Sequence, residues 1–291
     1  MTLATQIQPD TEAAQALARR YGSDLPEGLA PDVGGWNPTL SLLLDHRSTR
    51  SFLPDAPLPA GTLETLIAAA SSAPTSSNLQ AWSVVAITDP DRKARLARLA
   101  SLPEHGGVQQ HIIDAPLFLV WIADLSRAGR VADAAGETLA ALGYTDNTVV
   151  AALDAAFAAQ NALIAAQSLG LGGVYIGAIR NQPEAVAEAL NLPPHSFAVV
   201  GLAIGHPDPG VKTEVKPRLP QSVVLHRETY DPARDAGIAA HDRATLAFRA
   251  RQKLPPLTWS ALVIGRLAKV ETLHGRQFLR AALARLGLPL E

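Results

Sequence analysis

The feature that most constrains the fold is the run VVAALDAAFAAQNALIAAQSLGLGG at residues 149–173. Its apolar residues and alanines recur with helical spacing, which predicts one long helix over about 149–169. The run carries Asp154, Gln160, Asn161 and Gln167, so it is too polar and too rich in alanine for a membrane span. We therefore expect a helix that is buried or lies at an interface, where small side chains allow close helix packing.

Short apolar runs alternate with helical patterns from residue 40 to about 232. Strands are predicted at WSVVAIT (82–88), LFLVWIA (117–123), AVVGLAIG (198–205) and SVVLH (222–226). Helices are predicted at 62–71, 90–100, 131–142 and 183–190. The strands are apolar on both faces, so helices should cover both sides of the sheet. The pattern indicates an α+β or mixed α/β class with four or five core strands.

The two ends of the chain read differently from this core. Residues 1–39 are predicted to form an N-terminal arm, with a helical pattern at about 10–21 followed by a segment dense in glycine and proline. Residues 233–291 are predicted to form a helical C-terminal extension that is interrupted at Pro255–Pro256. The predicted divisions are thus 1–39, 40–232 and 233–291.

Composition excludes several classes of function. The chain has 291 residues, of which 47% are hydrophobic, so it can bury a sizeable core. With no cysteine, it can form no disulfide, thiolate nucleophile, iron–sulfur cluster or cysteine-based zinc site. A net charge of -2 with 18% charged residues argues against a nucleic-acid partner. The N-terminus lacks the pattern of a signal peptide, so we expect a soluble cytoplasmic protein without a membrane partner.

Common catalytic motifs are missing from the sequence. It contains no G-x-S-x-G elbow, no P-loop and no H-E-x-x-H pair among its eight histidines, so no metal site is predicted. The stretch GLGGVYIGAIR (170–180) is rich in glycine, but it follows a helix and lacks the dinucleotide-binding order. Its glycines would let the backbone approach a ligand closely, although a helix C-cap also explains Gly170 and Gly172.

Three polar stretches remain as candidate binding segments. APTSSNLQAW (73–82) concentrates hydroxyls and amides between a helix and a strand, as a solvated turn or a ligand-binding loop would. DHRSTRSF (45–52) and VKPRLP (215–220) carry arginines whose planar guanidinium groups match phosphate oxygens, and prolines fix the backbone of the second. Taken singly, each basic stretch is also explained as a solvated surface turn.

These stretches, in this order, resemble the FMN-dependent nitroreductase family, and most closely its NADPH-preferring oxygen-insensitive nitroreductase and flavin reductase group. The resemblance spans roughly residues 40–232, is much weaker beyond 240 and is absent for residues 1–39. It implies an α+β fold: a mostly antiparallel sheet of four to five strands covered by helices, with an extended helical C-terminal tail. It also implies a homodimer with FMN bound at the subunit interface.

Carried over motif by motif, the resemblance implies a set of FMN-binding residues: His46, Arg47, Ser48, Thr49, Arg50, Thr75, Ser76, Ser77, Asn78, Gln109, Tyr175, Ile176, Gly177, Ala178, Lys216, Pro217 and Arg218. Arg47 and Ser48 would hold the phosphate, and Arg50 would lie near N1 and O2 of the flavin. The family commonly has glycine at the position of Ala178. The 2′-phosphate of NADPH would bind Arg249, Arg251 and Lys253, which a solvated helix end explains equally well.

The implied function is a ping-pong oxidoreductase in which FMN carries the hydride chemistry, so no protein residue is predicted to be catalytic. NADPH would be the donor, with NADH as the alternative, and the acceptor a small molecule: a nitroaromatic, quinone, azo compound or free flavin. One alternative is an FMN-binding protein that delivers flavin or contacts a partner through the 1–39 arm, with incidental turnover. Another keeps the fold and changes the reaction, as in branches that cleave flavin, remove halogens or dehydrogenate rings.

Overall fold

The computed structural model describes residues 12–22, 36–101, 107–288 and 290–291, and these form two compact units. The sheet unit falls within Ser48–Val211 and Leu273–Glu291, and the helical unit within Met1–Arg47 and Lys212–Thr272. Most of the predicted 1–39 arm lies outside the described residues, as do positions 10 and 11 of its predicted helix. The division into three parts stays a prediction.

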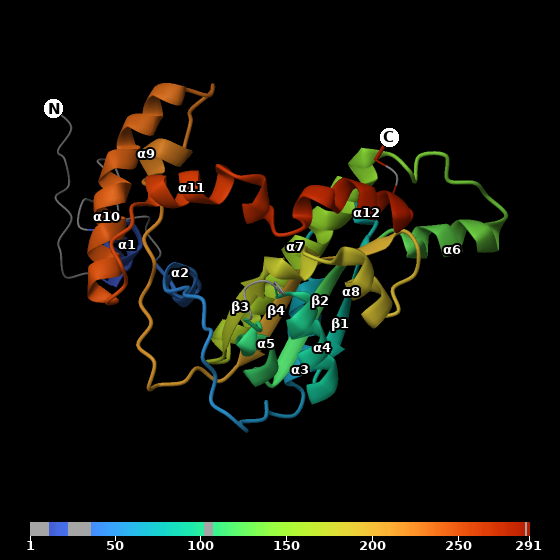
Figure 1. Cartoon of the computed structure of the whole chain (residues 1–291), viewed down its shortest axis with the longest axis horizontal. Helices are drawn as coiled ribbons and strands as arrows, with labels where there is room; N and C mark the ends of the chain where they lie inside the picture. The colour runs from blue at the N-terminus through green and yellow to red at the C-terminus, as the bar shows by residue number, and fades with distance from the viewer. Residues whose placement is uncertain (1–11, 23–35, 102–106, 289) are drawn as a thin grey trace. The chain divides into compact units, whose positions relative to one another are not determined.

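The sheet unit is built on four antiparallel strands in the order β1-β2-β4-β3 (Figure 1). The strands are β1 (Trp82–Ile87), β2 (Leu117–Asp124), β3 (Gly172–Ile176) and β4 (Ser196–Gly205). The helices of this unit are α3 (Thr62–Ser71), α4 (Pro90–Leu99), α5 (Gln110–Asp114), α6 (Ser126–Ala135), α7 (Thr145–Ser168), α8 (Pro183–Ala189) and α12 (Leu279–Arg285). Its single-turn 3₁₀ helices are η1 (Ser76–Asn78), η3 (Gly177–Arg180) and η6 (Arg276–Phe278). The predicted α+β class is confirmed.

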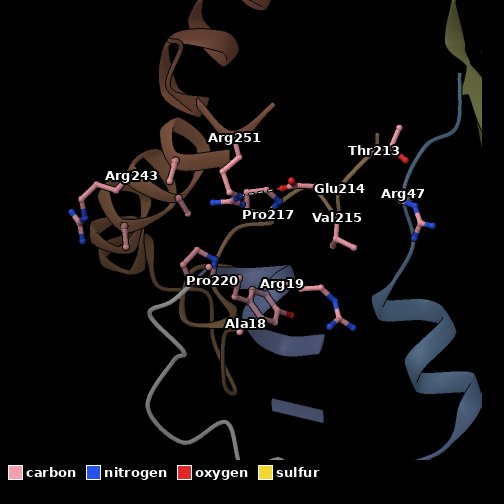
Figure 2. A pocket seen from close by; sticks show the side chains of 15 residues that line it. Ala18, Arg19, Arg47, Thr213, Glu214, Val215, Pro217, Pro220, Arg243 and Arg251 are labelled. Atoms are coloured by element: carbon pink, nitrogen blue, oxygen red, sulfur yellow. Dashed lines mark hydrogen bonds and ion pairs between the residues drawn. The ribbon is translucent and has the colours of Figure 1, made fainter. Parts of the chain in front are cut away.

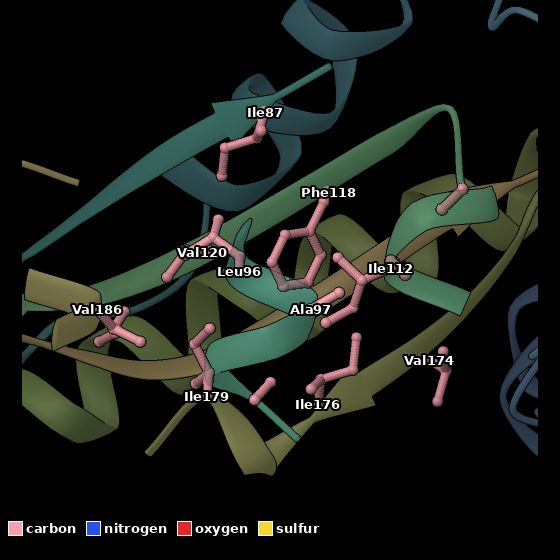
Figure 3. Close-up of a cluster of buried hydrophobic side chains, with 14 of the residues drawn as sticks. Ile87, Leu96, Ala97, Ile112, Phe118, Val120, Val174, Ile176, Ile179 and Val186 are labelled. Atoms are coloured by element: carbon pink, nitrogen blue, oxygen red, sulfur yellow. The ribbon is translucent and has the colours of Figure 1, made fainter. Parts of the chain in front are cut away.

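Alternation along β2 explains why both faces of the sheet carry helices. Phe118, Val120 and Ile122 enter a hydrophobic cluster with residues of α4, α5 and α8. Figure 3 shows Phe118 and Val120 in this cluster beside Leu96 and Ile112. The intervening residues of β2, Leu117, Leu119 and Trp121, enter a second cluster with residues of α3 and α7. Every residue of β2 is buried, as a central strand with period-two side chains between two helical layers requires.

Helix α7 is the long helix that the Ala-rich run predicts. Its alanines at 155, 158, 159, 162 and 166 are fully buried in the second cluster, where small side chains bring the helix backbone close to the sheet. By length and composition α7 could cross a membrane, but 44% of its most apolar window is buried inside the protein. The prediction of a helix that is buried or lies at an interface is confirmed as to burial on the side that packs on the sheet, while the interface remains a prediction.

The helical unit contains the described elements of the N-terminal segment and of the long excursion after residue 211. They are α1 (Glu12–Tyr21), α2 (Pro38–Leu44), α9 (Gln221–Val224), η4 (Pro232–Gly237), α10 (Ile238–Arg251) and α11 (Trp259–Leu267). A further 3₁₀ turn, η5 (Val270–Leu273), crosses the boundary between the two units. Residues of α1, α10 and the 213–220 segment line a cavity of about 810 Å³, in which Figure 2 labels Arg19, Arg47, Arg243 and Arg251.

The predicted elements differ from the structure in three places. The segment 222–226 is not a strand, because α9 occupies Gln221–Val224 directly after Pro220, and the segment belongs to the helical unit rather than to the sheet. Conversely, β3 covers Gly172–Ile176, where no strand is predicted. A side chain at Gly172 would lie within 2.4–2.8 Å of Thr49, so glycine serves close packing inside a strand here. The helix expected at 131–142 is displaced, since α6 ends before Gly136, whose φ of 69° closes it.

Candidate functional site

The polar stretch 73–82 forms a loop of unusual backbone conformation between α3 and β1. Ser77, Asn78 and Gln80 all have positive φ values, of 49°, 55° and 49°. This left-handed region costs a residue other than glycine roughly 1–2 kcal/mol, so the loop needs contacts that enforce its shape. The side chains of Ser76, Ser77 and Asn78 are exposed, and that of Thr75 is half-buried. The loop therefore presents hydroxyl and amide groups from a held backbone.

The carboxylate of Asp154 supplies the first of these contacts. Asp154 lies in α7 with only 1% of its surface exposed. Its Oδ1 accepts the backbone N–H of Ser76 at 3.1 Å, and its Oδ2 accepts that of Ala81 at 3.0 Å. One buried side chain thus closes the loop across its left-handed residues. One signal for this role is visible in the sequence: Asp154 is a lone carboxylate in a mostly apolar, Ala-rich stretch.

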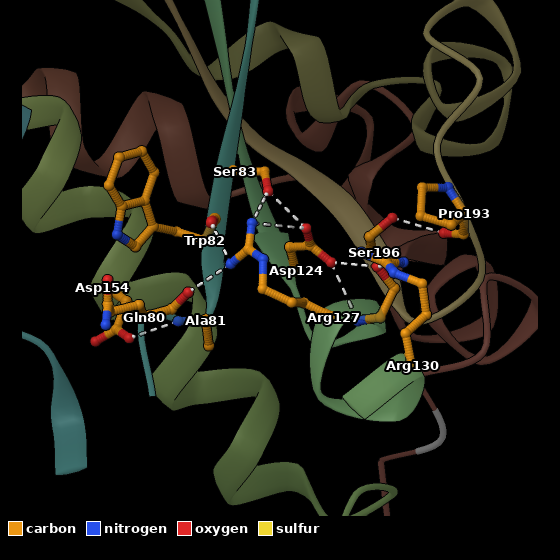
Figure 4. A network of polar contacts seen from close by, with 11 residues as sticks. Gln80, Ala81, Trp82, Ser83, Asp124, Arg127, Arg130, Asp154, Pro193 and Ser196 are labelled. Carbon is orange, nitrogen blue, oxygen red and sulfur yellow. Dashed lines mark hydrogen bonds and ion pairs between the residues drawn. The ribbon is translucent and has the colours of Figure 1, made fainter. Parts of the chain in front are cut away.

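Arg127, at the start of α6, holds the other side of the same loop (Figure 4). Its Nη1 donates to the carbonyl oxygens of Gln80 at 2.9 Å and Trp82 at 3.2 Å, and its Nη2 donates to Ser83 Oγ at 2.8 Å. Burial opposes the charge of Asp124, but hydrogen bonds from Ser126 and Ser83 and the nearby Arg127 keep the pKa of that carboxyl below its ordinary value. The Asp124 side chain remains an anion that orients Arg127.

The 45–52 stretch meets the glycine-rich 170–180 stretch at β3, the edge strand of the sheet. The backbone N–H of Thr49 donates to the Gly173 carbonyl at 3.0 Å, and the buried Thr49 side chain packs on Gly172. Tyr175 donates its hydroxyl to Gln160 on α7 at 3.3 Å, and burial raises its pKa. Ile176 is buried in the core. Gly177 and Ala178, which begin η3, are half-buried.

Arg50 and the segment before α5 also come together. Burial, and then the positive charge of Arg50, lower the pKa of His111, while Asp114 opposes them. Gln109 directly precedes α5, is half-buried and donates its backbone N–H to Ser101 Oγ at 3.0 Å. Arg50 itself is exposed. The sheet unit therefore gathers Arg50 and the 109–111 segment in one neighbourhood.

In the helical unit the remaining cations face two cavities. Arg47, Pro217 and Arg251 line the cavity of about 810 Å³ (Figure 2). A second cavity, of about 520 Å³, is lined by Lys216, Arg218 and Arg249 together with residues of α10 and α11. Each arginine that was predicted to bind NADPH therefore shares a cavity with residues that were predicted to bind FMN.

Two of the three predicted NADPH residues, Arg249 and Arg251, contact groups of the protein itself. Arg251 contacts the Glu214 carboxylate at 3.1 Å, and Arg249 Nε donates to the Pro255 carbonyl at 2.6 Å. Lys253 is exposed and has a φ of 54°. A hydrogen bond from Arg251 and the field of Lys212 lower the pKa of Glu214 against the effect of its burial, so Glu214 offsets part of the positive charge here.

Comparison with known proteins assigns the family. A model of the nitroreductase family matches residues 43–206, which is more than half of the chain. The chain belongs to the nitroreductase family. A second model, of the C-terminal domain of that family, matches residues 216–291. The likeness of this nitroreductase-family chain to its relatives thus extends beyond residue 240, where the sequence resemblance is much weaker.

Named relatives point to one group within the family. An FMN reductase (NADPH) of Bacillus subtilis is 42% identical over 67% of this chain and 75% of its own length. An oxygen-insensitive NADPH nitroreductase of Salmonella typhimurium is 41% identical over 71% of this chain and 80% of its own. The structure of an NADPH:FMN oxidoreductase from Vibrio harveyi complexed with NAD⁺ matches with a TM-score of 0.75 and 35% identity, over 88% of this chain and all of that one.

The donor groups described above suit FMN by their chemistry. A phosphate monoester needs cations and N–H donors, which the helical unit supplies through Arg47, Lys216 and Arg218. A ribityl chain and the polar edge of a flavin ring need hydroxyl, amide and backbone groups, which the 75–78 loop and η3 present from the sheet unit. Taken separately, the residues of each unit fit the part of the cofactor whose chemistry they match.

We expect Asp154→Asn to loosen the 73–82 loop without unfolding the protein. The substituted amide keeps one acceptor but turns a donor toward a backbone N–H, which should lower the free energy of unfolding by about 1–3 kcal/mol. Hydrogen exchange should accelerate at the Ser76 and Ala81 amides. The control is Asp133→Asn at an exposed position of α6. Equal exchange rates in the Asp154 variant and the wild type would contradict the role of Asp154.

We expect His111 to be neutral at pH 7, with a pKa below the ordinary 6.5. The unfolded chain then takes up a proton before the folded one does, so the stability from this residue is present above pH 6.5 and is lost as the pH falls below 6.5 and through the lower pKa of the folded state. An NMR titration of the imidazole measures the pKa directly. Arg50→Gln should raise it and Arg95→Gln should not. A pKa at or above 6.5 in the wild type would show the expectation to be wrong.

Proposed function

We propose that this chain is an FMN-dependent oxidoreductase that takes electrons from NADPH and reduces a small acceptor: a nitroaromatic, a quinone or a flavin. Membership of the nitroreductase family carries the proposal, and the names of the relatives, FMN reductase (NADPH) and oxygen-insensitive NADPH nitroreductase, support the donor and the cofactor. When bound, FMN supplies the two-electron chemistry by accepting hydride from the donor and returning it to the acceptor.

In this proposal the side chains of the protein bind and orient FMN and stabilise the charge that develops on it. Arg47, Lys216 and Arg218 bind the FMN phosphate, and the held loop at 75–78 presents its hydroxyl and amide groups to the rest of the cofactor. Arg50 places a positive charge where negative charge develops on reduction, which favours transfer of both electrons. No side chain has to exchange a proton with the substrate, in keeping with the assignment of no catalytic residue.

The donor's 2′-phosphate has a narrower set of candidate ligands. Arg249 and Arg251, at the end of α10, line cavities that also carry cofactor-binding candidates. We propose that these two arginines, with Lys253, favour NADPH over NADH by binding that phosphate. Because Arg251 is paired with Glu214, the phosphate would have to displace that carboxylate, which makes the preference for NADPH moderate rather than absolute.

We also propose that the protein is a soluble, cytoplasmic homodimer. Helix α7 leaves Val149, Leu153 and Phe157 between 45% and 50% exposed, at positions four residues apart that form one stripe. In the helical unit, Leu262 and Leu267 of α11 are exposed as well. Apolar stripes of this kind are typical of a surface that a second subunit covers. A reducing compartment suits a chain without cysteine and an NADPH donor.

A second candidate function, FMN binding without significant turnover, can be distinguished from the oxidoreductase by steady-state kinetics. If the protein only bound FMN for delivery or for contact with a partner, it would carry flavin but consume NADPH at a negligible steady rate. The loop and the cations serve binding in both cases, so turnover is the deciding property.

The deciding experiment is a visible spectrum of the purified protein followed by anaerobic titration with NADPH and, separately, NADH. We expect flavin bands that NADPH bleaches and that return on addition of a quinone or nitroaromatic. Arg47→Ala with Arg218→Ala should strip the flavin from a folded protein. A colourless protein that takes up no added FMN, or a double variant that keeps its FMN, would overturn the assignment.

For the dimer, we expect Phe157→Glu to yield monomers. The substitution places a charge in the apolar stripe of α7, where a covering subunit would desolvate it without a partner. Light scattering after size-exclusion chromatography gives the mass. Val131→Glu, at an exposed apolar position of α6, is the matched control and should leave the mass unchanged. A Phe157 variant with the wild-type mass would place the subunit contact elsewhere.

A further inference from the structure

A buried arginine in the N-terminal helix joins the two cationic segments of the helical unit. Arg20, in the last turn of α1, is only 7% exposed. Its Nη2 donates to the Leu44 carbonyl at 2.6 Å and the His46 carbonyl at 2.9 Å, while its Nη1 donates to the Lys216 carbonyl at 3.1 Å. In return, the Arg20 carbonyl accepts the backbone N–H of Arg218 at 2.9 Å.

This arrangement is specific to a guanidinium group. Three carbonyls from two segments far apart in the sequence converge on one planar group whose donors point in fixed directions. An ammonium group on a flexible stem offers a compact charge without that planar fork, so lysine could not reproduce the bridge. The contacts define where the backbone carrying His46 and Arg47 lies relative to the backbone carrying Lys216 and Arg218.

The location of Arg20 is electrostatically costly without an anion. Burial, and then the charge of Arg218, lower its pKa, whereas Tyr21 and Asp45 favour its charged form. The carboxylate of Asp45 is contacted by the neighbouring Arg19 at 2.9 Å. A cation is therefore buried among backbone carbonyls beside segments that are themselves basic. The positive potential that accumulates there suits a ligand with a doubly charged phosphate.

We propose that Arg20 is a positioning residue for the FMN phosphate: it holds the 46–47 and 216–218 segments in the relative arrangement that binds the anion. The inference rests on the proposed function, because it takes FMN as the cofactor. It makes helix α1, which precedes the residues that match the nitroreductase family model, part of the cofactor site. Arg20 acts through its neighbours and need not touch the phosphate.

The test compares two flavins that differ only in the phosphate. Full-length flavin-loaded protein is diluted, release is followed by flavin fluorescence, and the stripped protein is titrated with FMN and with riboflavin. Arg20→Met should weaken FMN binding by about tenfold or more, since charged hydrogen bonds that order the site are lost. Riboflavin binding should change less than about threefold, because riboflavin has no phosphate. Arg20→Lys should behave like Arg20→Met.

Two controls separate positioning from general damage. Arg285→Ala removes an exposed arginine with a two-point contact to Glu184 in the sheet unit, and should leave both affinities unchanged. The unfolding temperature of each variant reports folding, and Arg20→Lys carries the test if Arg20→Met does not fold. Equal losses for FMN and riboflavin, or no loss for either, would overturn the role of Arg20. A wild-type protein that binds neither flavin would instead overturn the proposed function.

Discussion

The shape of the 73–82 loop depends on the buried carboxylate of Asp154. Three left-handed residues within the four positions 77–80 cost several kcal/mol together, so the isolated segment would not keep this conformation. Asp154 offsets the cost by accepting two backbone N–H groups, and in the buried setting neither its charge nor those N–H groups would otherwise be satisfied. Because the Asp154 carboxylate and the two N–H groups satisfy one another, the loop has one favoured conformation. Exposed hydroxyl and amide groups can then be preorganised, which lowers the entropy lost on binding.

In the helical unit, the buried cation of Arg20 joins backbone segments as the buried carboxylate of Asp154 does in the sheet unit. Arg20 is surrounded by carbonyl oxygens, as Asp154 is by N–H groups, and each joins backbone segments instead of pairing with another side chain. Backbone dipoles do not titrate and cannot swing away, so such a bridge fixes geometry more strictly than an exposed ion pair would. Arg127 makes a similar bridge at a more exposed position: its guanidinium group donates to the carbonyls of Gln80 and Trp82 and lies near the Asp124 carboxylate. Charged helix residues therefore shape all three of the segments that the binding proposal uses.

The sequence predicts the elements that bury a regular apolar pattern, but not the contacts between backbone segments far apart in the chain. The helix at Thr62–Ser71 and the strands near Trp82, Leu117 and Ser196 were predictable, because each buries a regular apolar pattern. Strand β3 was missed because Gly172 serves contact with Thr49, 123 positions earlier, which no local pattern encodes. Residues that bridge backbone segments were missed for a similar reason. Carbonyls and N–H groups exist at every position, so nothing in the sequence marks which ones Arg20 or Arg127 will meet.

Helix α7 connects the held loop to the exposed apolar stripe. Its alanines face the sheet and bring the helix backbone close, Asp154 closes the loop, and Leu153 beside it belongs to the stripe that we propose a second subunit covers. A helix of 24 residues packed along a sheet moves as a rigid body, so displacing one face displaces the others. A subunit seated on Leu153 and Phe157 would therefore resist any shift of Asp154. In this way the proposed dimer contact and the conformation of the loop that we propose binds FMN depend on the same helix.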